Sequence, residues 1–293
     1  MKFKHFSNSL LRSKSCENAA RFVFSLCSSF GAFVLGFILF VALKKGWDRL
    51  DFSFLISAAK SGGLEGGIVY QILGTLVLIS TAALITTPFA VAISILERTS
   101  SFPSLKVWIR SALHLLNATP SILFGIVGFI FFVKFCEWDK SWLGGGVILA
   151  IMILPTVTLS LINRIETIPH GYLETAKSLG LTDDDLIKSI LIPYGYGGLL
   201  TGLFMGLARA AGETAPIMFT AVVFSGATFP TGVKDNPVLA LPYHIFNMAQ
   251  DFLGDGAISG AWATAFVLIC FVLLVSLCLA PFRSRSHEEA RQK

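Results

Sequence analysis

The chain has 293 residues, of which 54% are hydrophobic and only 14% are charged, and its mean hydropathy is +0.72. Soluble domains average about 25% charged residues, so this composition excludes a soluble globular protein and indicates an integral membrane protein. The apolar residues come in blocks long enough for helices across a hydrocarbon core of about 30 Å. The sequence lacks the alternating ten-residue pattern of an outer-membrane barrel, so helices are expected.

The hydropathy pattern predicts an all-α, polytopic membrane fold with six transmembrane helices. The predicted spans are residues 22–43, 68–95, 112–133, 143–163, 194–222 and 258–281. About twenty polar and basic residues precede the first span and no small-x-small site clearly follows it, so we expect no cleavable signal peptide. The predicted organisation is a basic arm (1–21), a first helix with its outer loop (22–67), a core domain of five helices (68–281) and a tail (282–293).

The distribution of Lys and Arg predicts the orientation of the chain in the membrane. With both termini inside, the inner segments carry 15 of the 23 basic residues and the outer segments carry seven. Cytoplasmic loops carry the excess of Lys and Arg, so both termini are predicted to be cytoplasmic. The net charge of +5 is then explained by topology and attraction to the lipid surface. No basic stripe with interleaved aromatic residues suggests nucleic-acid binding.

The connection between the fourth and fifth predicted spans, residues 164–193, is polar but locally ordered. Pro169 suits the start of a helix, because its missing N–H is one that has no partner there. Residues 170–179 are expected to be helical, and Gly180 suits the left-handed position that follows a helix. These signals predict a short helix that ends in a glycine turn on the cytoplasmic side.

A second helix is predicted immediately after this turn. Thr182 is a good N-cap, Asp185 can return the capping bond, and acidic residues favour the positive end of a helix. The helix is expected to run through its apolar positions Leu186, Ile187, Ile190 and Leu191 until Pro193 stops it. This helical module (residues 169–193) is too short to enclose a core, so its apolar positions are expected to need a partner surface. Two interpretations stay open on spacing alone: a surface helical hairpin, or a docking surface for a partner.

The fifth predicted span contains a charged pair, Arg209 and Glu213. Residues four apart share a helix face, and each charge costs about 2.5 to 3.5 kcal/mol at the membrane centre. The pair either neutralises itself and fixes helix packing, or lines a wet pathway in which Arg209 binds an oxyanion such as phosphate or sulfate. Gly212 and Pro216 predict a bend beside the pair, as is common where spans line a site.

A few other polar residues are candidates for weaker roles. Thr119, with Asn117, could present polar atoms to a pathway, although capping roles are expected for both. His244 is expected to be an interface or gate-region residue and not a ligand. Glu97 and Arg98 are interpreted as solvated boundary charges at the inner end of the second span. No catalytic group and no metal-ligand spacing is recognised.

The helical module carries a motif as well as a shape. Its spacing Glu-x-Ala-x-x-x-Gly, nine residues, then Ile-x-x-Pro resembles the EAA loop of ABC importer permeases. The matching positions are Glu174, Ala176, Gly180, Ile190, Ile192 and Pro193, and Thr175 stands where that family usually has alanine. The resemblance implies a type I ABC importer permease fold in which the loop docks on a cytoplasmic ATPase.

The fifth span narrows the resemblance to the permeases of bacterial phosphate importers. Its stretch ARAAGETAPIMFTA (208–221) resembles theirs, as do TPSILFG (119–125), LPYHIF (241–246) and GAWATAFVLI (260–269). This likeness extends over most of the chain from about residue 68 onward.

This resemblance implies a phosphate permease in the bacterial cytoplasmic membrane. Its implied partners are a second permease subunit, an ATPase dimer that uses ATP and Mg, and an extracytoplasmic phosphate-binding protein. The chain itself has no G-x-x-x-x-G-K-[ST] loop, so it is expected to bind no cofactor and to be no ATPase. The alternatives are a permease for another oxyanion, such as sulfate or molybdate, and an ion-coupled secondary transporter.

Overall fold

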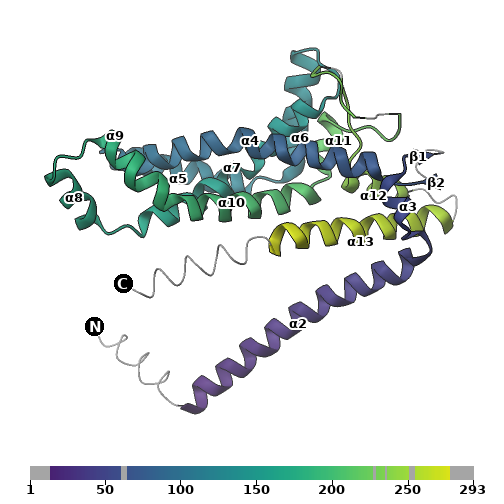
Figure 1. Cartoon of the computed structure of the whole chain (residues 1–293), viewed down its shortest axis with the longest axis horizontal. Helices are drawn as coiled ribbons and strands as arrows, with labels where there is room; N and C mark the ends of the chain where they lie inside the picture. The colour runs from purple at the N-terminus through teal and green to yellow at the C-terminus, as the bar shows by residue number, and fades with distance from the viewer. Residues whose placement is uncertain (1–13, 61–64, 227–228, 235, 251–254, 278–293) are drawn as a thin grey trace.

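The computed structural model describes residues 14–60, 65–226, 229–234, 236–250 and 255–277. These residues are mostly helical, with one two-stranded antiparallel pair (Figure 1). The elements are α2 (Lys14–Gly46), η1 (Trp47–Arg49), α3 (Phe52–Ile56), β1 (Ala59–Lys60), β2 (Glu65–Gly66), α4 (Val69–Thr99), α5 (Pro103–Ala118), α6 (Ser121–Gly128), η3 (Phe129–Phe135), α7 (Trp142–Glu166), α8 (His170–Ser178), α9 (Asp183–Leu186), η4 (Ile187–Leu191), α10 (Ile192–Gly212), α11 (Ala215–Thr220), α12 (Leu241–Gln250) and α13 (Asp255–Leu277). Within these ranges, five helices are long and apolar enough to cross a membrane, or six if one bent pair counts as a span.

Four of the six predicted spans are confirmed as single helices. The predictions 22–43, 68–95, 143–163 and 258–281 correspond to α2, α4, α7 and α13. α2, α7 and α13 begin before the predicted start, because hydropathy detects the apolar part and not the polar turns at the ends, and α4 begins one residue after it. Residues 278–281 of the last predicted span lie outside the described residues. The all-α fold is therefore confirmed, and the remaining two spans differ in an informative way.

The third predicted span, 112–133, is wrong as a continuous helix. The chain forms α5 up to Ala118 and then turns by 94° into α6 and the π-helical η3. The break lies at Thr119 and Pro120, both of which have extended ψ angles of 130° and 134°. Proline disfavours the helical conformation in the residue before it, which explains why the helix ends at this point.

The fifth predicted span, 194–222, is also interrupted. α10 ends at Gly212, Glu213 is extended with ψ 127°, and the short helix α11 begins at Ala215. The bend that Gly212 and Pro216 predict is confirmed. Figure 1 shows α6 and α11 close together, projecting sideways from the long helices of the bundle.

α7 is the central helix of the bundle and lies between α4 and α10 (Figure 1). One face of α10 carries the buried glycines Gly195, Gly198, Gly202 and Gly206, and this face meets α7. A Cβ atom at Gly202 would lie 2.8 Å from the Cα atom of Val157 on α7. Small residues therefore set the closest approach of the two helices, as is usual in membranes.

The helical module and the strand pair lie at opposite ends of the bundle (Figure 1). α12 lies at the strand end, outside the candidate spans, and carries His244. The His244 side chain is buried and lines a small cavity with Gln71 and Tyr243. Burial lowers the pKa of His244 to about 4, so its imidazole is neutral at neutral pH.

Replacing Gly202 by leucine should destabilise the contact between α7 and α10. The added side chain meets backbone atoms of Val157, and such overpacking costs about 1–3 kcal/mol. The measurement is the thermal midpoint of the purified protein in detergent. Gly36→Ala is the control, because a Cβ at Gly36 has nothing within 4 Å and should leave the midpoint unchanged or slightly higher. A Gly202→Leu midpoint equal to that of the parent would contradict the packing.

The thermal stability should decrease as the pH falls from 6.5, the ordinary pKa of histidine, to about 4. In this window the unfolded chain binds a proton at His244 and the folded chain does not, so protonation favours unfolding. At 1.36 kcal/mol per pKa unit the loss is about 3 kcal/mol, while above pH 6.5 the contribution is fully present. His244→Gln should remove this component from a plot of Tm against pH. Parallel plots for the two proteins would show that His244 does not contribute.

Candidate functional site

The predicted charged pair lies where α10 ends. The Arg209 Nε atom donates to Glu213 Oε1 at 3.4 Å, and the Arg209 Nη1 atom donates to Asn117 Oδ1 at 3.2 Å. The Arg209 side chain is 35% exposed and the Glu213 side chain is 18% exposed. The guanidinium is therefore held by two neighbours and still reaches a surface that no other described part of the chain covers.

The geometry of the pair differs from the prediction in one respect. Arg209 and Glu213 do not share a helix face, because the helix ends at Gly212 and Glu213 is extended. They still meet, since the carboxylate folds back toward the last turn of α10. At 1.5 Å per residue, Arg209 lies about 24 Å along the helix from Pro193, which is past the middle of a bilayer of ordinary thickness.

Two helix breaks meet beside Arg209. α5 ends just before Thr119, and α10 ends just before Glu213. The continuing helices α6 and α11 pack closely, since a Cβ at Gly125 would lie 2.8 Å from the Ala215 carbonyl oxygen. Broken helices inside a membrane are tolerated where protein or a water-filled cavity surrounds them, and in transporters they form substrate sites.

The two polar residues at the end of α5 have different roles in the structure. Asn117, for which a capping role was expected, instead accepts the bond from Arg209. The Thr119 hydroxyl donates to the Leu115 carbonyl at 2.9 Å, so in this conformation it belongs to the end of α5. The pathway role of Thr119 stays a prediction, as do those of Arg209 and Glu213.

The helical module has the expected helix–glycine–helix shape. Gly180 has φ +91°, the left-handed conformation that glycine adopts most easily. The Leu181 N–H donates to the Ala176 carbonyl at 3.2 Å, and the Gly180 N–H donates to the Lys177 carbonyl at 2.9 Å, which is the Schellman pattern of a helix end. Both the expected first helix and its glycine turn are confirmed.

The predicted N-cap of the second helix is also confirmed. The Thr182 hydroxyl accepts from the Asp185 N–H at 3.2 Å, and the Asp185 carboxylate accepts from the Thr182 N–H at 3.1 Å. This reciprocal capping box satisfies two N–H groups that a helix start leaves without partners.

The prediction that Pro193 stops this helix is wrong. η4 is a π-helix between α9 and α10, and Pro193 lies in the first turn of α10. Proline has no N–H and its ring clashes with a carbonyl of the preceding turn, and the wider π-turn accommodates this within a continuing helix. Residues Asp183–Gly212 therefore form one continuous helical segment of 30 residues.

The apolar positions of the module pack largely on the chain's own helices. Ile190 and Leu191 belong to a cluster with Leu161 and Ile165 of α7. The expectation that these positions need a partner surface is therefore wrong for this cluster. The module exposes much of α8, including Tyr172 and Glu174, the following residue Leu179, and the first turn of α9. Of the predicted docking positions, Glu174, Gly180 and Pro193 are exposed, while Ala176 is buried at 9% exposure.

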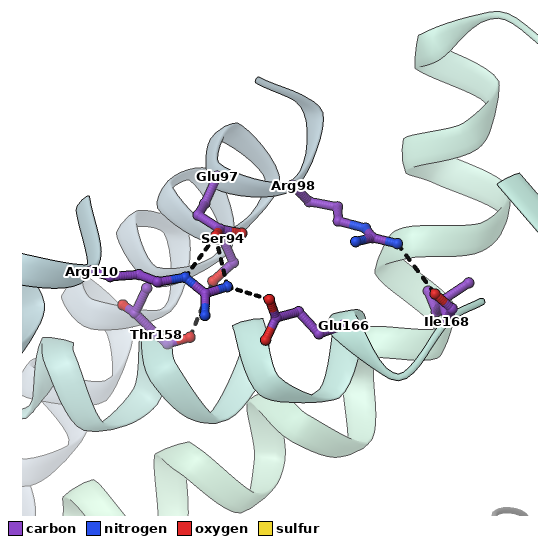
Figure 2. Close-up of polar contacts among 7 residues, drawn as sticks. All are labelled: Ser94, Glu97, Arg98, Arg110, Thr158, Glu166 and Ile168. Carbon is purple, nitrogen blue, oxygen red and sulfur yellow. Dashed lines mark hydrogen bonds and ion pairs between the residues drawn. The ribbon is translucent and has the colours of Figure 1, made fainter. Parts of the chain in front are cut away.

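An ion triad (Glu97, Arg110 and Glu166) joins three helices near the module (Figure 2). The Arg110 Nε and Nη2 atoms donate to Glu97 Oε1 at 2.8 and 2.7 Å, and Nη2 also donates to Glu166 Oε1.

The interpretation of Glu97 as a solvated charge is wrong, because its side chain is only 4% exposed. Arg98 is not simply solvated either, since its Nη2 donates to the Ile168 carbonyl at 3.2 Å. The sequence does carry a signal for the pair of Glu97 and Arg110: the two opposite charges lie on either side of the short connection at residues 100–102, so the turn can bring them together.

Residues 87–285 match the family described as the binding-protein-dependent transport system inner membrane component. The chain belongs to this family. The match begins inside α4 and includes the module, the ion triad and Arg209.

Similar proteins of known name agree with this assignment. The chain is 29% identical over 273 residues to the phosphate transport system permease protein PstA of Pasteurella multocida, covering 92% of this chain and 96% of that protein. It is 30% identical over 232 residues to PstA 2 of Mycobacterium tuberculosis, covering 76% and 74%. It is 26% identical over 277 residues to the probable ABC transporter permease protein YqgI of Bacillus subtilis, covering 90% and 94%.

A solved structure shows that the fold is shared. One chain of the MetNI methionine ABC transporter in an inward-facing conformation superposes with a TM-score of 0.53 and 14% sequence identity. The likeness covers 74% of this chain and 94% of that chain. The predicted ABC importer permease fold is therefore confirmed.

Replacing Thr182 by alanine should loosen the start of α9. The Asp185 N–H loses its side-chain acceptor, at a cost of about 1 kcal/mol. We expect amide hydrogen exchange at Asp185 and Leu186 to become about fivefold faster, as measured by mass spectrometry. Thr175→Ala is the control, because that hydroxyl only donates to the Gly171 carbonyl within α8. Unchanged exchange in Thr182→Ala would show that the cap does not hold the helix.

Proposed function

We propose that this chain is a permease subunit of an ATP-driven importer that carries inorganic phosphate across the bacterial cytoplasmic membrane. The observation that carries the proposal is the partly exposed Arg209 guanidinium, which lies at the meeting of two broken helices inside a membrane bundle. The names of the relatives, phosphate transport system permease proteins, support phosphate as the cargo.

The chemistry of Arg209 suits an oxyanion. A guanidinium has five N–H donors. Within the described part of the chain, the bonds of Arg209 to Asn117 and Glu213 use two of these five donors. Three donors remain for phosphate oxygens, whose spacing matches the planar guanidinium. Glu213 holds the cation while the site is empty and can release it when an anion arrives. Thr119, at the same break, is proposed to contribute to the pathway in another conformation.

The cation also lowers the barrier for the cargo. An anion that enters a membrane loses much of its hydration, and a fixed positive charge with oriented donors replaces part of what water supplied. Glu213 limits the strength of this attraction, because a site that binds too tightly would not release phosphate on the other side.

The energy for transport is proposed to come from a partner. The helical module, with Glu174, Ala176, Gly180, Ile190 and Pro193 in the positions of the EAA motif, would dock on a cytoplasmic PstB-like ATPase dimer that uses ATP and Mg. The other proposed partners are a PstC-like second permease and an extracytoplasmic PstS-like phosphate-binding protein. Both termini would then be cytoplasmic, in agreement with the excess of Lys and Arg on that side.

Arg209→Ala and Glu213→Ala should each lower uptake of labelled phosphate by about tenfold or more. Arg209→Ala removes the cation that binds the anion, and Glu213→Ala removes the carboxylate that holds this cation and limits its attraction for the anion. Uptake is measured in cells whose only phosphate importer contains the variant chain. Expression and co-purification of the partner subunits should stay at the parental level. Normal uptake with full expression of both variants would contradict the pathway role.

The same assay separates the alternatives. Excess unlabelled phosphate should abolish the signal, while sulfate and molybdate should leave it intact. Competition by sulfate or molybdate would indicate an importer of another oxyanion. Uptake that continues in a strain without the ATPase activity would indicate an ion-coupled secondary transporter.

A further inference from the structure

The ion triad and the Arg209 site are attached to the same helix, α5. Arg110 binds Glu97 and Glu166, and seven residues further along α5 Asn117 binds Arg209. Seven residues are almost two full turns, so Arg110 and Asn117 lie on one face of α5 about 10 Å apart. The face of α5 that holds the triad therefore also holds the cation of the candidate pathway.

Few apolar contacts hold α5 in place. Leu113, between Arg110 and Asn117, is the one buried residue of this helix, and Leu116 is packed at the edge of the main core. Trp108 and Leu115 on its other side are at least 71% exposed, and Val107, about one turn before Arg110, is 64% exposed. The position of α5 against the bundle thus depends strongly on its polar contacts at Arg110 and Asn117.

The two carboxylates of the triad differ in burial. Glu97 on α4 is 4% exposed and accepts two bonds from Arg110, whereas Glu166 is 43% exposed and accepts one. A buried charge without its partner is costly, so the pair of Arg110 and Glu97 is a permanent attachment of α5 to α4. The bond to Glu166 is exposed and weaker, and it can change without leaving a buried charge alone.

Glu166 connects this attachment to the helical module. It is the last residue of α7, and Pro169, three residues later, begins the module. Figure 2 shows Arg110 between the two carboxylates, and it shows Arg98 beside the triad donating to the Ile168 carbonyl at 3.2 Å. Glu166 is therefore the member of the triad that lies nearest to the module along the chain.

We propose that the ion triad transmits movement of the helical module to Arg209 through α5, with Arg110 and Glu166 as positioning residues for transport. A partner that moves the module moves Glu166, Glu166 moves Arg110, and α5 carries the shift two turns further to Asn117. Asn117 then changes how Arg209 is held. This inference rests on the proposed function, because it assigns the force on the module to the ATPase.

The test compares variants that break the link in different ways. Glu166→Gln removes the negative charge from the exposed bond, which weakens it, and keeps the buried pair, so the protein should fold normally. Glu97→Gln combined with Arg110→Met removes the whole triad without leaving a buried charge. Lys106→Met is the matched control, because Lys106 lies one turn earlier on α5 and outside the triad. The complete complex is reconstituted in vesicles, and phosphate uptake and ATP hydrolysis are measured together.

The expected result is a loss of coupling. The phosphate carried per ATP should fall at least about threefold in Glu166→Gln and about tenfold in the double variant, while Lys106→Met keeps the parental ratio. A merely structural role would lower uptake and hydrolysis in proportion and leave the ratio unchanged. A decrease of less than threefold in Glu166→Gln would overturn the inference.

A second measurement does not depend on the cargo. Spin labels are placed at Leu115→Cys on α5 and Lys188→Cys on η4, both exposed positions, in a chain without its native cysteines. Trapping the complex with ATP and vanadate should change the distance between the labels in Glu166→Gln more than in the parent. Equal changes in the two proteins would overturn the inference.

The two experiments distinguish failure of this inference from failure of the proposed function. If the parental vesicles hydrolyse ATP but import no phosphate, the proposed function fails, and the label distances alone decide whether α5 follows the module.

Discussion

The close contact between α7 and its neighbours α4 and α10 is the interaction on which the rest of the structure depends. Lipid is as apolar as leucine, so membrane helices associate through close packing and interhelical hydrogen bonds and not through exclusion of water. The buried glycines of α10 supply the packing. Hydroxyl groups supply the bonds: Thr86 donates to the Ala150 carbonyl, and Ser160 donates to the Gly198 carbonyl. α7 is fixed on both sides by these contacts. It therefore positions Glu166, its own last residue, and also Arg209 on the neighbouring helix α10.

This rigid centre makes an irregular region possible beside it. An unpaired backbone group in hydrocarbon costs several kcal/mol, so a helix can break inside a membrane only where other protein or a water-filled cavity is at hand. The breaks at Thr119 and Glu213 satisfy this condition together. The helix after the first break, α6, packs against the helix after the second break, α11. The charge of Arg209 lies at the same place, where polar partners already exist.

Local chemistry was predictable from the sequence, and long-range geometry was not. Gly180 and the Thr182–Asp185 cap follow from contacts within a few residues, and the structure has both. The break at Pro120 was missed because hydropathy sums over about twenty residues and does not notice a 94° turn inside an apolar block. Glu97 was misread for a related reason: its partner Arg110 comes from the next helix, and no periodicity within one helix can pair them.

At Pro193 a local signal predicts a helix end that does not occur. Pro193 is a strong local signal for a helix end, yet the helix continues through it. The neighbouring contacts of η4 with α7, in the cluster around Leu191, stabilise a continuing helix that the local signal alone disfavours. A local rule holds when the contacts around it are local, as at Gly180, and fails when a neighbouring helix decides the outcome.

The π-turn at Ile187–Leu191 also has a consequence for how lengths are read along this helix. A π-turn absorbs about one surplus residue within about one turn, so the faces before and after it keep the directions that they would have without that residue. Counting at 100° per residue from Asp185 to Arg209 therefore points Arg209 about a quarter-turn away from its true direction. The direction of Arg209 around the helix axis is set by its distance from the π-turn and not by its distance from the capping box. Differences of a single residue in the module can thus be absorbed without turning Arg209 away from Asn117.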